Sequence, residues 1–162
     1  MKRLTTVYQD YNVPMNSSPA TAFHTLSPDT VLDALESIGL FSDGRLLALN
    51  SYENRVYQVG IEDAAPIVVK FYRPARWSDA AIHEEHQFVD ALHQREIPVV
   101  PPQQIHGVSL HHHQDHRFAV FARQGGRAPA LDQAGTLTWI GRFLGRIHAV
   151  GVTQPFVERP KL

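Results

Sequence analysis

The chain contains no cysteine, which excludes disulfide bonds and thiolate metal sites and is typical of proteins of a reducing cytosol. It has no surplus of basic residues, since its net charge is −1, so it predicts neither a nucleic-acid nor a membrane partner. No hydrophobic run approaches a membrane span, and a polar stretch follows the basic start, which argues against a signal peptide. With 162 residues, 43% of them hydrophobic, the sequence predicts a cytoplasmic, globular chain with a core of its own.

Residues 1–22 show neither helical nor strand periodicity and are rich in Asn, Ser and Pro. Such a composition buries too little apolar surface to offset the entropy of ordering, so it predicts a disordered leader. Met15 is an alternative start to Met1.

Capping residues and apolar spacing predict three helices. One begins after Ser27 and ends near Gly39, a second follows Ser78 and runs to about Glu96, and a third lies between Asp132 and Gly151. Runs of β-branched and aromatic residues predict five strands, with the second helix inserted after the third. The predicted strands are Arg45–Leu49, Arg55–Ile61, the run between Pro66 and Pro74, Gln104–Leu110 and Arg117–Ala122. Short connections favour a mostly antiparallel sheet in an α+β fold.

A cation, Lys70, lies in the middle of the third predicted strand. Alternation places it on one face with Val68 and Tyr72, although both faces of this strand are largely apolar. An unpaired buried ammonium is too unfavourable to persist, so Lys70 needs a carboxylate, an anionic ligand or a stem that reaches water.

The second predicted helix carries an acid where its apolar stripe needs a hydrophobic residue. At about 100° per residue, Glu85 falls near the middle of the stripe, whereas Glu84 lies to one side. We therefore expect Glu85 to pair with Lys70 where the helix packs beside the strand. Such a pair is either purely structural or holds an ammonium in place for the phosphates of a nucleotide.

Several segments carry a resemblance to known proteins. They are Leu49–Gln58, Val69–Pro74, Glu85–Leu92, Phe118–Phe121 and Leu144–His148. The sequence resembles the aminoglycoside phosphotransferase and choline kinase branch of the protein-kinase-like superfamily, and within it the bacterial stress-response serine/threonine protein kinases. The similarity runs from about Ser17 to the end of the chain.

The resemblance implies a protein-kinase-like small lobe over residues 23–123, made of a five-stranded antiparallel sheet, an inserted helix and an N-terminal helix. Residues 124–162 then contain the hinge and the first helix of an incomplete large lobe. The implied partners are ATP, Mg²⁺ and a protein substrate.

The resemblance also assigns an ATP-binding role to nine residues. Lys70 contacts the α- and β-phosphates and Glu85 orients it. The loop that covers the phosphates is Ser51, Tyr52, Glu53 and Asn54, and the hinge that binds adenine is Phe121, Ala122 and Arg123. This loop lacks the Gly-rich pattern of ordinary protein kinases, and from its residues alone an ordinary hairpin turn is an equally good interpretation.

No catalytic residue is assigned within this chain. Phosphoryl transfer needs an Asp to accept the substrate proton and further Asp and Asn side chains for magnesium, and the related His-Gly-Asp signature is absent. The nearest string, His106-Gly107-Val108, lacks the carboxylate. We therefore expect weak nucleotide binding and no phosphate transfer from these residues alone.

An alternative function is a non-catalytic interaction module or a histidine-rich metal-binding module. Its candidate ligands are His106, His111, His112, His113 and His116. Consecutive histidines on a strand point to opposite faces, so the favoured interpretation is a solvated hairpin tip and no metal site.

The last predicted helix presents an apolar stripe, Leu137, Ile140, Leu144 and Ile147, which predicts self-association.

Overall fold

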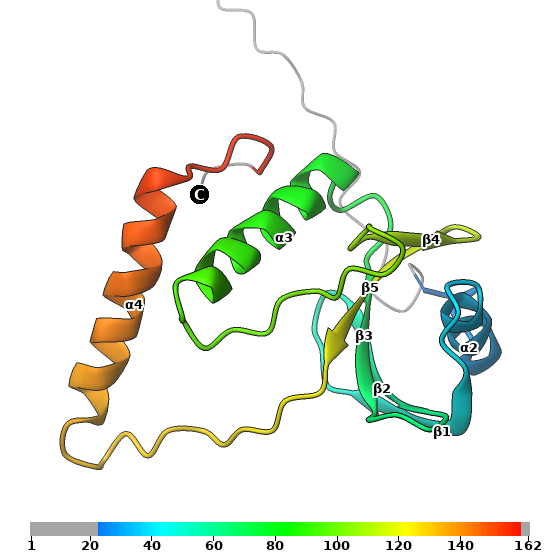
Figure 1. Cartoon of the computed structure of the whole chain (residues 1–162), viewed down its shortest axis with the longest axis horizontal. Helices are drawn as coiled ribbons and strands as arrows, with labels where there is room; N and C mark the ends of the chain where they lie inside the picture. Colours follow the sequence, from blue (N-terminus) through cyan, green and yellow to red (C-terminus); the bar gives the residue numbers. More distant parts are fainter. Residues whose placement is uncertain (1–22, 160–162) are drawn as a thin grey trace, which may run out of the picture.

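The computed structural model describes residues 23–159, so the predicted leader over residues 1–22 lies outside the described part. Three helices and five strands follow one another along this part (Figure 1). The helices are α2 (Pro28–Glu36), α3 (Asp79–Gln94) and α4 (Thr136–Thr153). The strands are β1 (Ser42–Leu49), β2 (Arg55–Ile61), β3 (Ile67–Tyr72), β4 (His111–His113) and β5 (His116–Ala122).

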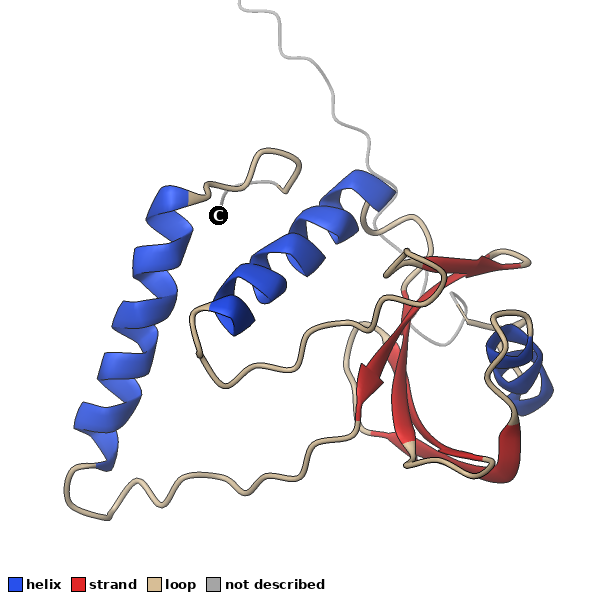
Figure 2. Cartoon of the chain, viewed as in Figure 1, coloured by secondary structure: helices blue, strands red, loops and turns tan. Residues whose placement is uncertain are grey.

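The strands form one sheet in the order β1-β2-β3-β5-β4, and every neighbouring pair is antiparallel. The predicted α+β class, with five antiparallel strands and a helix inserted after the third, is confirmed. Figure 2 shows α2 on one side of the sheet and α3 on the other, with α4 beyond α3.

Strand β3 lies at the centre of the sheet and contributes to both sides of the core. Its residues Ile67, Val69 and Phe71 pack toward α2, together with residues of β2 and β5. Tyr72 packs on the opposite face with Ile82 of α3. Successive side chains of β3 therefore enter the two core clusters in turn, as the sequence predicts, and Lys70 lies on the α3 side.

The predicted caps of the first two helices are confirmed. The hydroxyl of Ser27 accepts a hydrogen bond from the amide of Thr30, and that of Ser78 accepts one from Ala81. Gly39 has a φ of +84°, and its amide donates to the carbonyl of Glu36, so it closes α2 as expected.

The predicted strand Gln104–Leu110 is wrong. His106 and Gly107 both have positive φ, at 52° and 79°, and form a tight turn in which Ile105 and Val108 exchange two backbone hydrogen bonds. A left-handed pair interrupts a strand, so this segment is a loop and the strand begins later, at His111.

The histidine-rich segment is not the solvated hairpin tip that the sequence favoured. The tip is Gln114-Asp115, and the histidines around it lie in β4 and β5. His111 packs against Phe118 with ring centroids 5.4 Å apart and is buried. His116 is also buried, because it packs under the sheet on the α2 side and its Nε2 lies 3.0 Å from the hydroxyl of Thr25.

The last helix differs from its prediction at both ends. It begins at Thr136 after Gly135 rather than at Asp132, and it continues through Gly151 to Thr153. Gly151 lacks the positive φ that ends a helix, so the helical hydrogen bonds continue past it.

One side of α4 packs against the second half of α3 and the loop that follows it. This cluster consists of Phe88, Ala91, Leu92, Ile97, Val99, Phe143, Ile147 and Val150. The rest of the helix is open, since Leu137 is 67% exposed and Leu144 is 51% exposed. Of the predicted apolar stripe, Leu137 and Leu144 are therefore uncovered in residues 23–159 whereas Ile147 packs in this cluster, and self-association through the stripe stays a prediction. No helix in this range is both long and apolar enough to cross a membrane.

Candidate functional site

The ammonium of Lys70 and the carboxylate of Glu85 form the ion pair expected from the sequence. The Nζ atom lies 2.8 Å from Oε1, within hydrogen-bonding distance. The side chains are 21% and 27% exposed, so the pair is shielded from solvent but still reachable by a ligand. The pair joins the central strand to the helix that packs on it.

The sheet face around Lys70 is mainly apolar. Lys70 stands opposite Val56 of β2 and Ala119 of β5 in the ladder, and paired residues project on the same face. Two residues before Lys70 in β3, Val68 stands opposite Phe121, so Phe121 projects on this face too. The ring of Tyr72 adds a cation–π contact, with its centroid 4.5 Å from the lysine nitrogen. A cation thus lies beside an apolar and aromatic strip.

The predicted covering loop, Ser51 to Asn54, connects β1 to β2 and is tied to the segment that follows β3. Asn54 accepts a hydrogen bond from the backbone amide of Arg73, and Glu53 accepts one from the indole of Trp77. The hydroxyl of Ser51 donates to the carbonyl of Asn54, whose φ is not positive. Tyr52 is 93% exposed. The structure therefore places the loop at the Lys70 end of β3, with the Ser51 hydroxyl engaged in closing its own turn.

The predicted hinge residues lie where β5 ends. Phe121 and Ala122 are half-buried and still paired with β3, opposite Val68 and Ile67. Arg123 is exposed, and its guanidinium donates to the side-chain oxygen of Gln58 at 2.9 Å. Of the nine predicted residues, the structure joins Lys70 and Glu85 directly and places Phe121 on the same sheet face.

A further cation, which sequence reasoning missed, contacts the other oxygen of Glu85. Arg159, in the segment after α4, forms an ion pair with Oε2 of Glu85. The two residues are 74 positions apart, and no local pattern in the sequence links them. Next to it, the Glu84 carboxylate accepts hydrogen bonds from the backbone amides of Val157, Glu158 and Arg159.

Behind the ion pair lies a buried polar network centred on His86. Its Nε2 lies 2.7 Å from the hydroxyl of Tyr72, and its Nδ1 lies 2.7 Å from that of Ser109. Burial, followed by the nearby charge of Glu85, raises the pKa of Tyr72, so this phenol stays protonated and donates to Nε2. Burial lowers the pKa of His86 to about 4, so the imidazole is neutral and its Nδ1–H faces Ser109.

This network predicts an acid-sensitive fold. The folded-state pKa of His86 lies below the value of about 6.5 that an unfolded histidine has. Between these values the unfolded chain binds more protons, so stability falls as the pH falls from about 6.5 to about 4, by on the order of 2 to 3 kcal/mol from this residue. Denaturant unfolding at a series of pH values measures this loss.

In a His86→Gln variant, we expect a less stable fold whose stability depends less on pH over this range. A His148→Gln variant, which changes an exposed histidine of α4, provides the control and should keep the wild-type slope. Equal slopes for wild type and His86→Gln would contradict the assignment of the acid sensitivity to His86.

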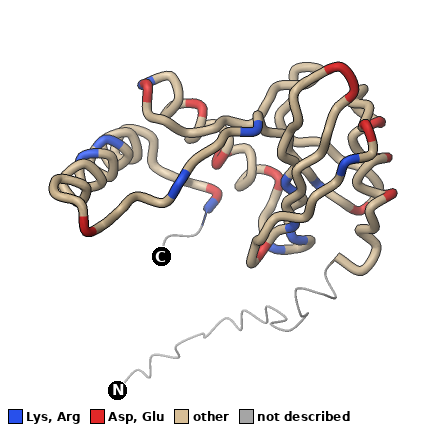
Figure 3. The backbone as a smooth tube through the Cα atoms, turned by 90° about the horizontal axis from the view of Figure 1, so that it is seen from below, with Lys and Arg blue, Asp and Glu red and all other residues tan. Residues whose placement is uncertain are grey.

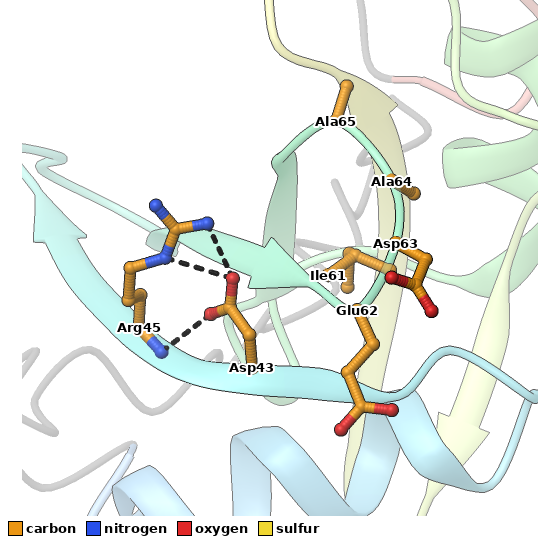
Figure 4. Close-up of a pocket in the computed structure, with 7 residues that line it drawn as sticks. All are labelled: Asp43, Arg45, Ile61, Glu62, Asp63, Ala64 and Ala65. Carbon is orange, nitrogen blue, oxygen red and sulfur yellow. Dashed lines mark hydrogen bonds and ion pairs between the residues drawn. The ribbon is translucent and has the colours of Figure 1, made fainter.

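A separate hollow of about 670 Å³ lies at the other end of β2 (Figure 4). It is lined by Asp43, Arg45 and residues 61–65, and Arg45 is bound to Asp43 within it. Its charge is mainly acidic and it contains no aromatic residue, so it does not suit a polyphosphate. Elsewhere acidic and basic residues are interspersed along the chain (Figure 3).

The histidines do not form a metal centre in residues 23–159, where no group of three or more His, Cys, Asp or Glu side chains is placed to hold an ion. Instead they divide between the two faces of their hairpin. His112, for example, is exposed and lies 3.0 Å from Asp79, whereas His111 is buried.

The chain is similar to known proteins. A model of the phosphotransferase enzyme family matches residues 45–162. Stress response kinase A of Escherichia coli strain K12 is 48% identical over 148 residues, which cover 91% of this chain and 45% of that protein. Serine/threonine protein kinase RdoA of Salmonella typhimurium is 46% identical over the same share of each chain. The chain thus spans less than half the length of these curated relatives.

A solved structure shares the fold. Amicoumacin kinase hAmiN superimposes with a TM-score of 0.66 at 24% identity, covering 83% of this chain and 42% of that one. The α+β architecture with a kinase-like small-lobe sheet, expected from the sequence, is therefore confirmed. Because the family model extends over most of the chain, including the Lys70–Glu85 pair and α4, the chain belongs to the phosphotransferase enzyme family.

Proposed function

We propose that this chain is the nucleotide-binding portion of an ATP-dependent protein kinase that phosphorylates serine or threonine in a bacterial stress response. The observation that carries the proposal is the Lys70–Glu85 pair, 2.8 Å apart, on a sheet face that also presents Phe121. An ammonium fixed by a carboxylate suits the α- and β-phosphates, and the apolar strip suits a purine.

The comparisons support the class of ligand and reaction. Amicoumacin kinase hAmiN was described in complex with AMP-PNP, Ca²⁺ and Ami, which supports a nucleotide and a divalent cation as ligands of the fold. For this chain we propose ATP and Mg²⁺. The names of the curated relatives support a protein as the phosphate acceptor and a role in stress response.

The nine predicted residues keep their proposed roles. Lys70 and Glu85 bind and orient the phosphates, the loop Ser51–Asn54 covers them through backbone amides, and Phe121–Arg123 contact the adenine edge. Residues 23–123 then form the small lobe and residues 124–162 begin the large lobe. We propose a cytoplasmic location, in keeping with the absence of cysteine.

The proposal is tested by thermal unfolding of the chain with ligands. ATP with Mg²⁺ at ten times its dissociation constant is expected to raise the melting temperature by about 3 to 6 °C. AMP, which lacks the β-phosphate, is expected to raise it less. A shift with Zn²⁺ and none with ATP and Mg²⁺ would overturn the proposal in favour of a metal-binding module.

Phosphate transfer is a separate measurement. The sequence contains no His-Gly-Asp string, so we expect these 162 residues to bind ATP without phosphorylating a protein acceptor.

A further inference from the structure

The carboxylate of Glu85 is held from two sides. Its Oε1 atom accepts from Lys70 and its Oε2 atom accepts from Arg159. A glutamate has three side-chain torsions, so a single partner leaves its carboxylate free to rotate. Two cations on its two oxygens fix the plane of the group as well as its position.

Arg159 is itself oriented by groups other than Glu85. Its Nε donates to the carbonyl of Ala81, 3.3 Å away, in the first turn of α3. Its guanidinium lies over the ring of Trp77, 4.6 Å from the centroid. The indole of Trp77 in turn donates to Glu53 at 2.9 Å, so the arginine is connected to the loop between β1 and β2 as well.

The backbone that carries Arg159 is held by the neighbouring acid. Glu84 accepts hydrogen bonds from the amides of three consecutive residues, with distances of 3.1 Å to Glu158 and 3.0 Å to Arg159. Burial acts to raise the pKa of Glu84, but these amides outweigh it and hold the pKa below its usual value. The two adjacent acids of α3 thus bind different parts of this segment: Glu84 binds its backbone amides, and Glu85 binds the side chain of Arg159. Figure 1 shows this segment turning back from α4 toward α3.

From these contacts we propose that Arg159 is a positioning residue that holds Glu85 toward Lys70. The inference rests on the proposed nucleotide site, and it adds a contribution from the region that follows α4. Two cations share one carboxylate, so the group of three keeps an excess of positive charge for an anionic ligand. Without Arg159, Glu85 can turn away from Lys70, and the ammonium loses its fixed position.

Chemical modification of Lys70 tests this without any nucleotide. The lysines of the chain are Lys2, Lys70 and Lys161, and mass spectrometry of peptides separates them. The nitrogen of Lys70 is largely buried and donates to Glu85, so an acetylating reagent reaches it slowly while that contact is formed. The rate of acetylation of Lys70 relative to Lys2 therefore reports how well Glu85 holds it.

Arg159→Gln removes the charge but keeps a planar group over Trp77. It is expected to raise the Lys70-to-Lys2 ratio about threefold or more, toward the ratio of a Glu85→Gln variant. Arg159→Lys restores a cation and is expected to stay within about 1.5-fold of the wild type. Arg142→Gln, at an exposed arginine of α4, controls for the change of net charge.

The double variant separates a positioning role from a role that is only structural. If Arg159 acts through Glu85, then Arg159→Gln changes the acetylation ratio by less than about 1.5-fold once Glu85→Gln is present. Equal effects of Arg159→Gln in both backgrounds, or no effect in the wild-type background, would overturn the inference. Circular dichroism of each variant verifies that it is folded.

Nucleotide binding separates this inference from the proposed function. With ATP and Mg²⁺, Arg159→Gln is expected to weaken binding about three- to tenfold, and no further in the Glu85→Gln background. If the wild type binds no ATP while the acetylation ratios behave as expected, the proposed function fails and the positioning role stands. If ATP binds but the ratios do not change, the positioning role fails alone.

Discussion

A Lys70→Met variant is expected to bind ATP with Mg²⁺ about 100-fold more weakly than the wild type, because charge-assisted hydrogen bonds to two phosphates are lost. Methionine keeps the approximate length and the apolar stem of the side chain, so packing against the sheet remains while the ammonium and its cation–π contact with Tyr72 are lost. The loss therefore measures the ammonium rather than the packing. Titration calorimetry or the nucleotide-dependent melting shift gives the affinity.

The matched control is Arg45→Met, which removes an exposed cation at the other end of the sheet. Its affinity for ATP is expected to stay within about twofold of the wild type, since exposed charges at a distance are screened by salt. Full retention of the nucleotide-dependent shift in Lys70→Met would show that the candidate site lies elsewhere.

The largest expected effect on stability belongs to Phe71. Its side chain is fully buried at the centre of the sheet, stacked on Phe118 with ring centroids 5.3 Å apart and touching Tyr57 edge-on. Phe71→Ala is expected to lower the free energy of unfolding by about 3 to 5 kcal/mol, through lost apolar contact and the cavity left behind. Because the free energy of unfolding of a domain is only about 5 to 15 kcal/mol, such a loss removes a large part of its stability.

Denaturant unfolding measures this change, with Leu47→Ala as control. Leu47 lies on β1 and is 57% exposed, so its truncation is expected to change stability by less than about 1 kcal/mol. A similar loss in both variants would mean that Phe71 does not occupy the core that the structure assigns to it.

The predictions from the sequence are wrong at turns and at contacts between segments far apart along the chain. The sequence predicts a strand through His106-Gly107, but a glycine there permits a left-handed turn, and Gly107 adopts one with a φ of +79°. The sequence predicts that α4 ends at Gly151, yet glycine also tolerates helical dihedrals where the flanking residues favour them. The solvated interpretation of His111 and His116 is wrong because their burial involves Phe118 and Thr25, contacts that the local sequence does not report.

By itself, the sequence determined the alternation of β3, the capped helices α2 and α3, and the pairing of Lys70 with Glu85. These follow from short-range rules, because side chains repeat every two residues on a strand and every 3.6 on a helix, and a buried charge requires a partner. Only the tertiary structure decided that Arg159 lies on the other side of Glu85 and that His86 links Tyr72 to Ser109. Such contacts join segments far apart along the chain. They form, and stabilise the fold, only once α3 packs on the sheet and the segment after α4 packs on α3.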